Sequence, residues 1–240
     1  MNNTENFRQK IKNLLDESFK HIDDNKFKES LMDHILFKLG EVDEYKMTKP
    51  KKELCVPIIN TLIYSWNNDL HKDIYIDLII GLMNFHTQGS IHPRFVEIIK
   101  QLSDFEVKVL KYIYKVYAFN IMNLDTISIP TVNIIFKNKS TLKENLVLRD
   151  LIYIPFIKES DYDIYCIAIN NLISLNLIET NYKNFLEKDF LYEKIKNSDL
   201  FTFYKNLYNK RNNNNNNEFI VEKGILELTN LGKSLLYTIN

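Results

Sequence analysis

The sequence has little glycine, proline or cysteine. Of its 240 residues, five are glycine, five are proline and two are cysteine. Proteins built from strands and tight turns use more glycine and proline, so we expect a mostly helical chain. Two cysteines supply neither a disulfide framework nor a four-ligand zinc site. Both, Cys55 and Cys166, sit in apolar helical stretches, which is typical of buried reduced thiols.

A surplus of charge is missing as well. Lysine and arginine total 31, and so do aspartate and glutamate. A balanced chain has no overall attraction for nucleic acid or for an anionic membrane.

Long apolar runs are also missing. The start lacks the apolar region of a secretory signal, and the most apolar stretch, 74–85, contains Asp77 and is shorter than the roughly 20 residues of a membrane span. We therefore expect a cytoplasmic protein without a membrane span.

The clearest helix signals lie between Ile91 and Lys115, in the sequence IHPRFVEIIKQLSDFEVKVLKYIYK. Pro93 suits the first position of a helix, with His92 as its cap. A second helix is predicted to begin at the motif Ser-Asp-Phe-Glu, residues 103–106, which is a capping box. Both helices carry apolar residues at a period of 3.6, so we expect each to be packed in the core.

Apolar residues at helical spacing predict four earlier helices, at 4–20, 27–39, 54–66 and 70–85. Gly40 suits the position just after a helix end, and Pro57 is expected in the first turn of its helix. Gly81 is expected to let a neighbouring backbone approach closely. Together these patterns predict an antiparallel helical bundle over 54–118.

The pattern changes after residue 122. The segment DTISIPTVNIIF is rich in β-branched residues around Pro130, which favours an edge strand or an extended connector. Helices are predicted at 141–154 and 160–175, the latter with Ile164 and Ile167 facing inward. Short strands are predicted at 177–180 and 224–228, followed by a final helix capped at Thr229.

The order helix, helix, strand, strand, helix is that of a winged helix. An insertion at about 183–217 separates the two strands; it is predicted to be mostly one helix, 185–208, and to end in a run of asparagines that we expect to be disordered. The predicted fold class is therefore mainly α, with an antiparallel helical bundle over 1–122 and a winged-helix-like domain with a small β-hairpin over 123–240.

The segment HPRFVEIIKQLSDFEVKVLKYI resembles the signature of the Abi-alpha (abortive infection alpha) family of bacterial proteins, which is associated with phage resistance. The resemblance continues upstream through KPKKELCVPIINTLIYSWNNDLHKDIYIDLIIGLMNF and downstream in NNLISLNLIET and GILELTNLGKSLL. It covers residues 48–240, although 120–160 match only in general character. Family members often begin with a longer, more apolar region, from which this chain departs. The resemblance implies antiphage defence and supplies no catalytic residues.

One polar group stands at the start of the signature helix, formed by His92, Arg94 and Glu97. It could bind a phosphate, a nucleotide or a partner at the helix N-terminus. A simpler interpretation, which we favour, is a cap and one exposed ion pair between Arg94 and Glu97 that contributes at most about 1 kcal/mol. A modest basic side follows the same two helices, at Lys100, Lys108, Lys111 and Lys115.

The sequence holds five histidines, at positions 21, 34, 71, 86 and 92, without metal-binding spacing. His86 and His92 flank a linker and could meet in space, but satisfied turn and cap histidines are the simpler interpretation. No GxSxG, P-loop, GxGxxG or paired-carboxylate motif is present. We therefore predict no enzyme, no metal and no cofactor.

The resemblance leads to a functional hypothesis of antiphage defence through contact with a protein partner or a second copy. The alternative is a winged-helix regulator that binds nucleic acid. Helix 160–175 is a poor DNA reader because it carries Asp161 and Asp163 and no basic residue. A regulator would instead need a positive patch near helix 142–153, around Lys143 and Arg149. A third class, an enzyme acting on nucleotides, would need a pocket with clustered carboxylates or histidines.

Overall fold

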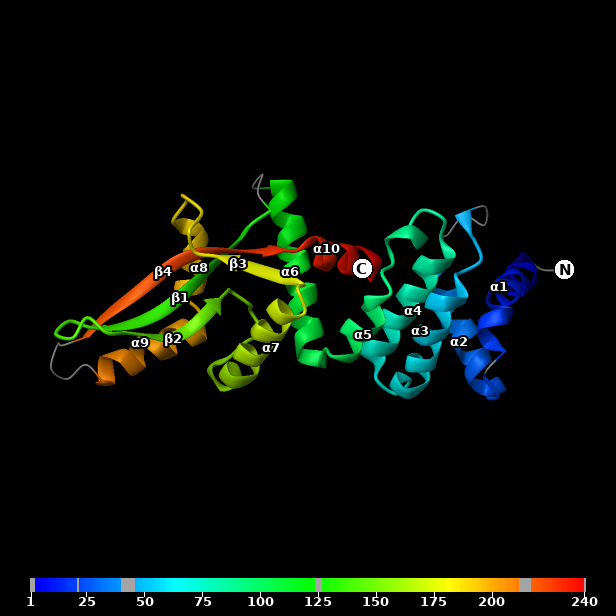
Figure 1. Ribbon diagram of the computed structural model, residues 1–240, viewed down its shortest axis with the longest axis horizontal. Helices are drawn as coiled ribbons and strands as arrows, with labels where there is room; N and C mark the ends of the chain where they lie inside the picture. Colours follow the sequence, from blue (N-terminus) through cyan, green and yellow to red (C-terminus); the bar gives the residue numbers. More distant parts are fainter. Residues whose placement is uncertain (1–2, 21, 40–45, 124–126, 212–216, 240) are drawn as a thin grey trace. The chain divides into compact units, whose positions relative to one another are not determined.

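The computed structural model describes residues 3–20, 22–39, 46–123, 127–211 and 217–239 (Figure 1). The chain divides into two compact units, one of Met1–Asp104 with Ser234–Asn240 and the other of Phe105–Lys233. Helices predominate, so the mainly α class is confirmed. Among the residues described, no helix combines the length and the apolar character that crossing a membrane requires.

The first unit consists of helices. Their bounds are α1 Asn3–Phe19, α2 Asn25–Lys38, α3 Lys52–Ser65, α4 Asp69–Met83, η2 Gln88–Ser90 and α5 Arg94–Lys100. Side chains cap the N-termini of α2 and α4, because Asp24 accepts from the N–H groups of the first turn of α2 and Asn68 does the same for α4. These helices agree with the predicted ones to within a few residues. Gly40, the predicted residue after a helix end, lies outside the described residues.

Helix α4 lies at the centre of the first unit. Its buried apolar side chains are Ile74, Tyr75, Ile76, Leu78, Ile79, Leu82 and Met83. Each buried leucine or isoleucine stabilises the fold by about 1.5–3 kcal/mol relative to exposure. Gly81 of this helix faces side chains and not the backbone we expected, because a Cβ there would lie 2.8 Å from Ile91 Cδ1 and 3.1 Å from Thr238 Cγ2. Helix α3 begins earlier than predicted, so Pro57 lies in its second turn.

The signature segment begins its helices within one residue of the predicted positions. Helix α5 is assigned from Arg94, one residue after the predicted start, although Pro93 already has helical dihedral angles. His92 Nδ1 accepts the Arg94 N–H at 3.1 Å, so the predicted capping hydrogen bond of His92 forms. Helix α5 buries Phe95 together with Val96, Ile98 and Ile99. Helix α6 spans Asp104–Asn123 and begins directly after Ser103. The hydrogen bonds of the capping box itself stay a prediction.

The second unit contains an antiparallel sheet of four strands. They are β1 Ile129–Asn138, β2 Glu144–Leu151, β3 Ile178–Asn181 and β4 Asn217–Leu228, in the spatial order β2-β1-β4-β3 (Figure 1). The predicted strands at 177–180 and 224–228 pair as expected, but β4 is longer and also pairs with β1. Strand β1 is internal, which corrects the expected edge strand or connector. Pro130 is tolerated because its pairing is with β4 alone; pairing with β2 begins at Val132.

Strand β2 replaces the helix predicted at 141–154, and that prediction is wrong. On β2, Leu148 pairs with Ile134 of β1 and Leu151 pairs with Val132. The two leucines are three residues apart, whereas their partners on β1 are two residues apart. The extra residue makes a β-bulge, in which Asp150 has φ 53°. The bulge turns Leu148 and Leu151 to the same buried side, so the strand imitates helical spacing. Without that helix the winged-helix assignment is not confirmed.

The remaining helices of the second unit are η3 Glu159–Asp161, α7 Tyr162–Ser174, α8 Phe190–Lys196, α9 Asp199–Arg211 and α10 Asn230–Thr238, the last shared between the units. Two predictions are corrected here. The insertion forms two helices that separate near Ser198, instead of one over 185–208. Helix α7 buries Tyr165 and Ile169, while Ile164 and Ile167 are exposed. The first five residues of the asparagine run, 212–216, fall outside the described ranges.

Two helices pack against the sheet. Helix α9 contributes an aromatic contact, since the ring of Tyr208 lies 5.3 Å from both Phe136 of β1 and Phe219 of β4. Helix α8 contacts β1.

The predicted cap of the last helix is confirmed, because Thr229 Oγ1 accepts the Gly232 N–H at 3.0 Å. The predicted domains, 1–122 and 123–240, place all of α6 with the bundle, whereas the compact units place it with the sheet from Phe105 on.

Candidate functional site

The predicted polar group at the start of α5 is fully at the surface. His92, Arg94 and Glu97 are all exposed. The carboxylate of Glu97 pairs with Lys100 at 2.8 Å, and not with Arg94 as expected. Since His92 caps the helix and the ion pair is exposed, these contacts contribute about 1 kcal/mol or less each. Ligand binding at this place stays a prediction.

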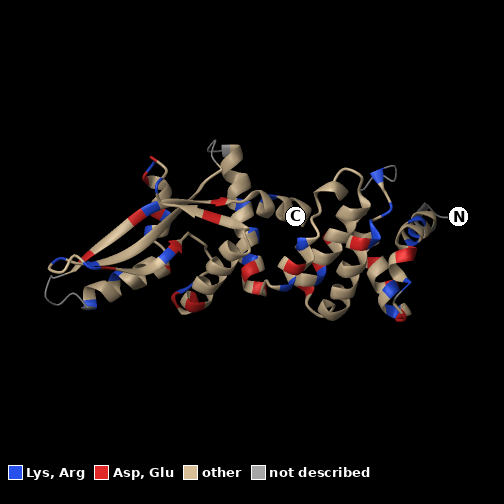
Figure 2. Cartoon of the chain, in the orientation of Figure 1, with Lys and Arg blue, Asp and Glu red and all other residues tan. Residues whose placement is uncertain are grey.

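The basic residues assigned to the nucleic-acid alternative lie elsewhere than expected. Lys143 lies in the turn before β2 and Arg149 lies on β2, both exposed. The neighbouring Lys137 is paired with Glu144 at 2.8 Å. Figure 2 shows acidic and basic residues interspersed along the sheet and the helices of this unit. A patch on a helix over 142–153 is therefore excluded, because that helix does not form.

The described histidines make separate local contacts. His71 Nε2 lies 2.9 Å from the Leu102 carbonyl, and His34 Nδ1 lies 2.8 Å from the Ser30 carbonyl. His86 contacts the ring of the adjacent Phe85, and His92 contacts the ring of Phe95, three residues further along the chain. Over the described ranges, no three histidine, cysteine, aspartate or glutamate side chains are grouped to hold a metal ion.

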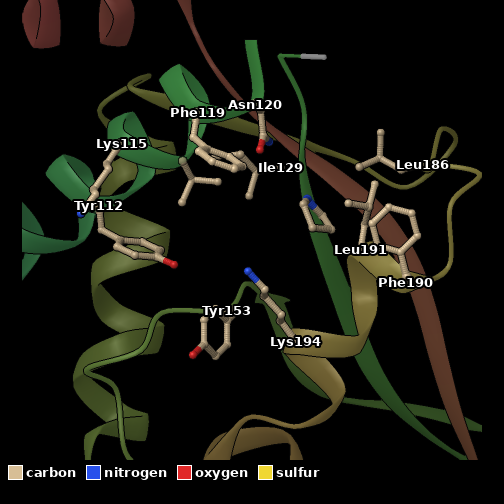
Figure 3. Close-up of a pocket in the computed structure, with 12 residues that line it drawn as sticks. Tyr112, Lys115, Phe119, Asn120, Ile129, Tyr153, Leu186, Phe190, Leu191 and Lys194 are labelled. Carbon is tan, nitrogen blue, oxygen red and sulfur yellow. The ribbon is translucent and has the colours of Figure 1, made fainter. Parts of the chain in front are cut away.

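A pocket with apolar walls lies inside the second unit, between α6, β1 and α8 (Figure 3). Its volume is about 410 Å³, within the range of small-molecule sites. It is lined by Tyr112, Lys115, Val116, Phe119, Asn120, Ile129, Pro130, Tyr153, Leu186, Phe190, Leu191 and Lys194. The elements that form it are secured by their own contacts, since α8 packs on β1 and Asn120 Nδ2 donates to the Ser128 carbonyl at 2.9 Å. We call it the α6–β1–α8 pocket.

Two large apolar side chains that line the pocket are largely exposed, and a third lies near one of them on α6. Phe119 of α6 is 58% exposed and Phe190 of α8 is 61% exposed. Met122, which is three residues beyond Phe119 and therefore on the same side of α6, is 82% exposed. Apolar side chains gathered around a concave site mark a binding surface more often than scattered ones do. We call these three residues the pocket mouth.

Two polar groups converge inside the pocket. Figure 3 shows the ammonium group of Lys194 and the hydroxyl group of Tyr112 pointing toward one another across it, whereas the hydroxyl of Tyr153 points away. Burial, with a smaller contribution from Tyr153, raises the pKa of Tyr112, so its hydroxyl keeps its proton and can donate. Lys115 adds a second exposed cation to the lining, and none of the described residues that line the pocket is an aspartate or glutamate.

The model of the abortive infection alpha family matches residues 3–239. The chain belongs to the abortive infection alpha family. The match includes both compact units and every residue of the α6–β1–α8 pocket, and it confirms the resemblance carried by the signature segment. Family membership indicates a role in defence of the abortive-infection type. Neither a curated protein nor a solved structure matches the chain.

This abortive infection alpha protein also holds a buried polar cluster at the bulge of β2. The hydroxyl of Tyr182 donates to Asp150 Oδ1 at 2.7 Å, and the hydroxyl of Tyr165 donates to the Asp150 carbonyl at 2.7 Å. The Asp150 N–H donates to Asn133 Oδ1 at 3.1 Å. Desolvation raises the pKa of Tyr182, and the Asp150 carboxylate raises it further. Because its polar groups are hydrogen-bonded to one another, we interpret the cluster as a structural network that stabilises the β-bulge.

Sequence reasoning found one member of the pocket, Lys115, as part of a basic helix side. It missed Lys194, Tyr112 and the exposed Phe119, because these residues lie up to 82 positions apart and share no spacing. The one signal available was an exposed phenylalanine on an otherwise amphipathic helix. That signal is weak, since single exposed apolar residues are common.

Proposed function

We propose that the chain is an antiphage defence protein of the abortive-infection type that acts within the host cell by contact with another protein. The observation that carries the defence role is the family match over residues 3–239. Support for action by contact comes from the pocket mouth, where two phenylalanines and a methionine project into solvent around an apolar pocket. Aromatic residues and methionine are enriched in protein interfaces, where covering them removes apolar surface from water.

The composition of the pocket also supports contact over chemistry. Its lining provides lysine, tyrosine and asparagine among apolar side chains, whereas hydrolysis of a nucleotide would draw on carboxylates or histidines. In protein interfaces, fewer than about 30% of the residues cost more than about 1 kcal/mol of binding free energy when truncated to alanine, and these residues lie near the centre of the interface. Removing both phenylalanines should therefore weaken a partner contact by at least about tenfold.

The test is a phage challenge of host cells that carry the intact gene or its variants. We expect the intact gene to reduce plaque counts for part of a broad phage panel, and Phe119→Ala with Phe190→Ala to restore them. Phe37→Ala is the matched control, because Phe37 is an 88% exposed phenylalanine on α2, outside the pocket mouth. Protein levels and circular dichroism establish that each variant is folded.

Two outcomes contradict different parts of the proposal. Unchanged plaque counts for the intact gene across the panel would leave the defence role without support. Full protection by the double variant would keep defence and remove the pocket mouth as the contact surface.

A further inference from the structure

The walls of the α6–β1–α8 pocket suit a hydrocarbon. Val116, Ile129 and Leu191 present aliphatic side chains, and Pro130 has no N–H to offer a ligand. One N–H of the Asn120 amide is already bonded to the Ser128 carbonyl. Against the aliphatic walls a polar molecule would lose hydrogen bonds to water without replacing them, whereas an apolar body would gain by leaving water.

One end of the pocket suits an anion. Figure 3 shows Lys194 Nζ directed into the space that the Tyr112 hydroxyl also faces. Within the described part of the chain, Lys194 has no ion pair, although Glu193 is its direct neighbour; that carboxylate pairs with Lys196 at 2.7 Å. Likewise, the Tyr112 hydroxyl has no hydrogen-bond partner among the described residues. Both groups are thus available as donors.

Together, Lys194 and Tyr112 favour a ligand with a negatively charged head group. An ammonium group and a protonated phenol both donate, and a carboxylate accepts from both with its two oxygens. The nearby ammonium of Lys115 adds positive potential, and the lining residues that the structure describes include no carboxylate to offset it. A cationic amphiphile would be repelled, and a neutral one would leave the lysine without a counter-charge.

From these observations we propose that the α6–β1–α8 pocket binds a small amphipathic carboxylate, with its hydrocarbon body against Val116, Ile129 and Leu191 and its carboxylate between Lys194 and Tyr112. This site goes beyond the proposed contact with a protein, and it does not depend on it. Lys194 and Tyr112 act as the specificity-determining residues, and the apolar walls bind any hydrocarbon of suitable size.

The test uses the purified full chain and three ten-carbon probes: decanoate, decan-1-ol and decylammonium. Isothermal titration should show that decanoate binds about tenfold or more tightly than decan-1-ol, because hydrogen bonds to a charged group add to the apolar contact. Lys194→Gln should reduce this preference to near unity, and Tyr112→Phe should reduce it severalfold. Lys194→Glu should reverse the order, so that decylammonium binds best.

Lys205→Gln and Lys205→Glu are the matched controls, since Lys205 is an exposed lysine of α9 outside the pocket. Both should bind decanoate like the unmodified chain. Equal affinity for decanoate and decan-1-ol in the unmodified chain would overturn the proposal, as would decanoate binding that Lys194→Gln leaves unchanged. Because no phage or partner enters this experiment, its failure leaves the defence proposal untouched, and the reverse also holds.

Discussion

At the scale of single residues, burial determines the pKa and the reactivity of the cysteine thiols. Cys55 of α3 is fully buried, as its apolar surroundings in the sequence predicted, while Cys166 is only partly buried. Desolvation raises the pKa of the Cys55 thiol to about 11, although a hydrogen bond with Ser18 acts in the opposite direction. At neutral pH the thiol therefore stays protonated and unreactive in the folded chain.

The Cys55 thiol should make the fold sensitive to alkaline pH. Its contribution is fully present below the unfolded pKa of 9.0, and it is lost between pH 9.0 and about 11 because the unfolded chain alone can release the proton. The loss approaches about 2–3 kcal/mol at the upper end of this window. Urea unfolding at several pH values, for the intact chain and Cys55→Ala, measures it. The variant should show a shallower decline; parallel declines would show that Cys55 does not contribute.

At the scale of elements, the sequence predicted the helices whose apolar residues recur at one regular spacing and whose first turn is capped. Helices α1 to α6 fall near their predicted positions because their apolar spacing is regular and residues such as His92 begin them. Strand β2 was missed because its bulge at Asp150 gives two leucines the spacing of a helix. The candidate site was missed because three elements distant in sequence contribute to it, and only long-range pairing brings them together.

The junction between β3 and α10 depends on the absence of one side chain. A Cβ at Gly232 would lie 2.1 Å from the Leu177 carbonyl oxygen, and Leu177 also accepts the Thr229 N–H. Gly232→Ala should therefore force the helix away from the strand and cost about 2–4 kcal/mol. Gly89→Ala is the control, since no atom of the described residues outside its chain neighbours lies within 4 Å of its added Cβ. Thermal unfolding of both variants measures the difference, and equal melting temperatures would contradict the close packing.

At the scale of the whole chain, the charges are balanced and mixed. The net charge is zero, and acidic and basic residues are interspersed in Figure 2. Lysines such as Lys38, Lys72 and Lys137 are paired with carboxylates within 2.6–2.8 Å. Nucleic-acid binding depends on unpaired basic groups that displace counterions. Such a distribution supplies little of that driving force.

Retention on duplex DNA checks this conclusion. We expect the purified chain to bind immobilised duplex no better than a neutral control protein at low salt, with no change in Lys143→Ala and Arg149→Ala. A steep loss of retention on adding salt would reveal phosphate contacts. That result, if the double variant abolished it, would restore the regulator hypothesis.

Pro130 affects whether strand β1 can pair with a strand of another molecule. Before Val132, strand β1 has β4 on one side and, within the described register, no strand on the other. An amide at that place could recruit a strand from another molecule, but proline has no hydrogen to donate. We therefore expect the ring to disfavour edge-to-edge pairing at this end of the sheet, so that Pro130→Val makes concentrated samples more prone to form fibrils, as thioflavin fluorescence would measure.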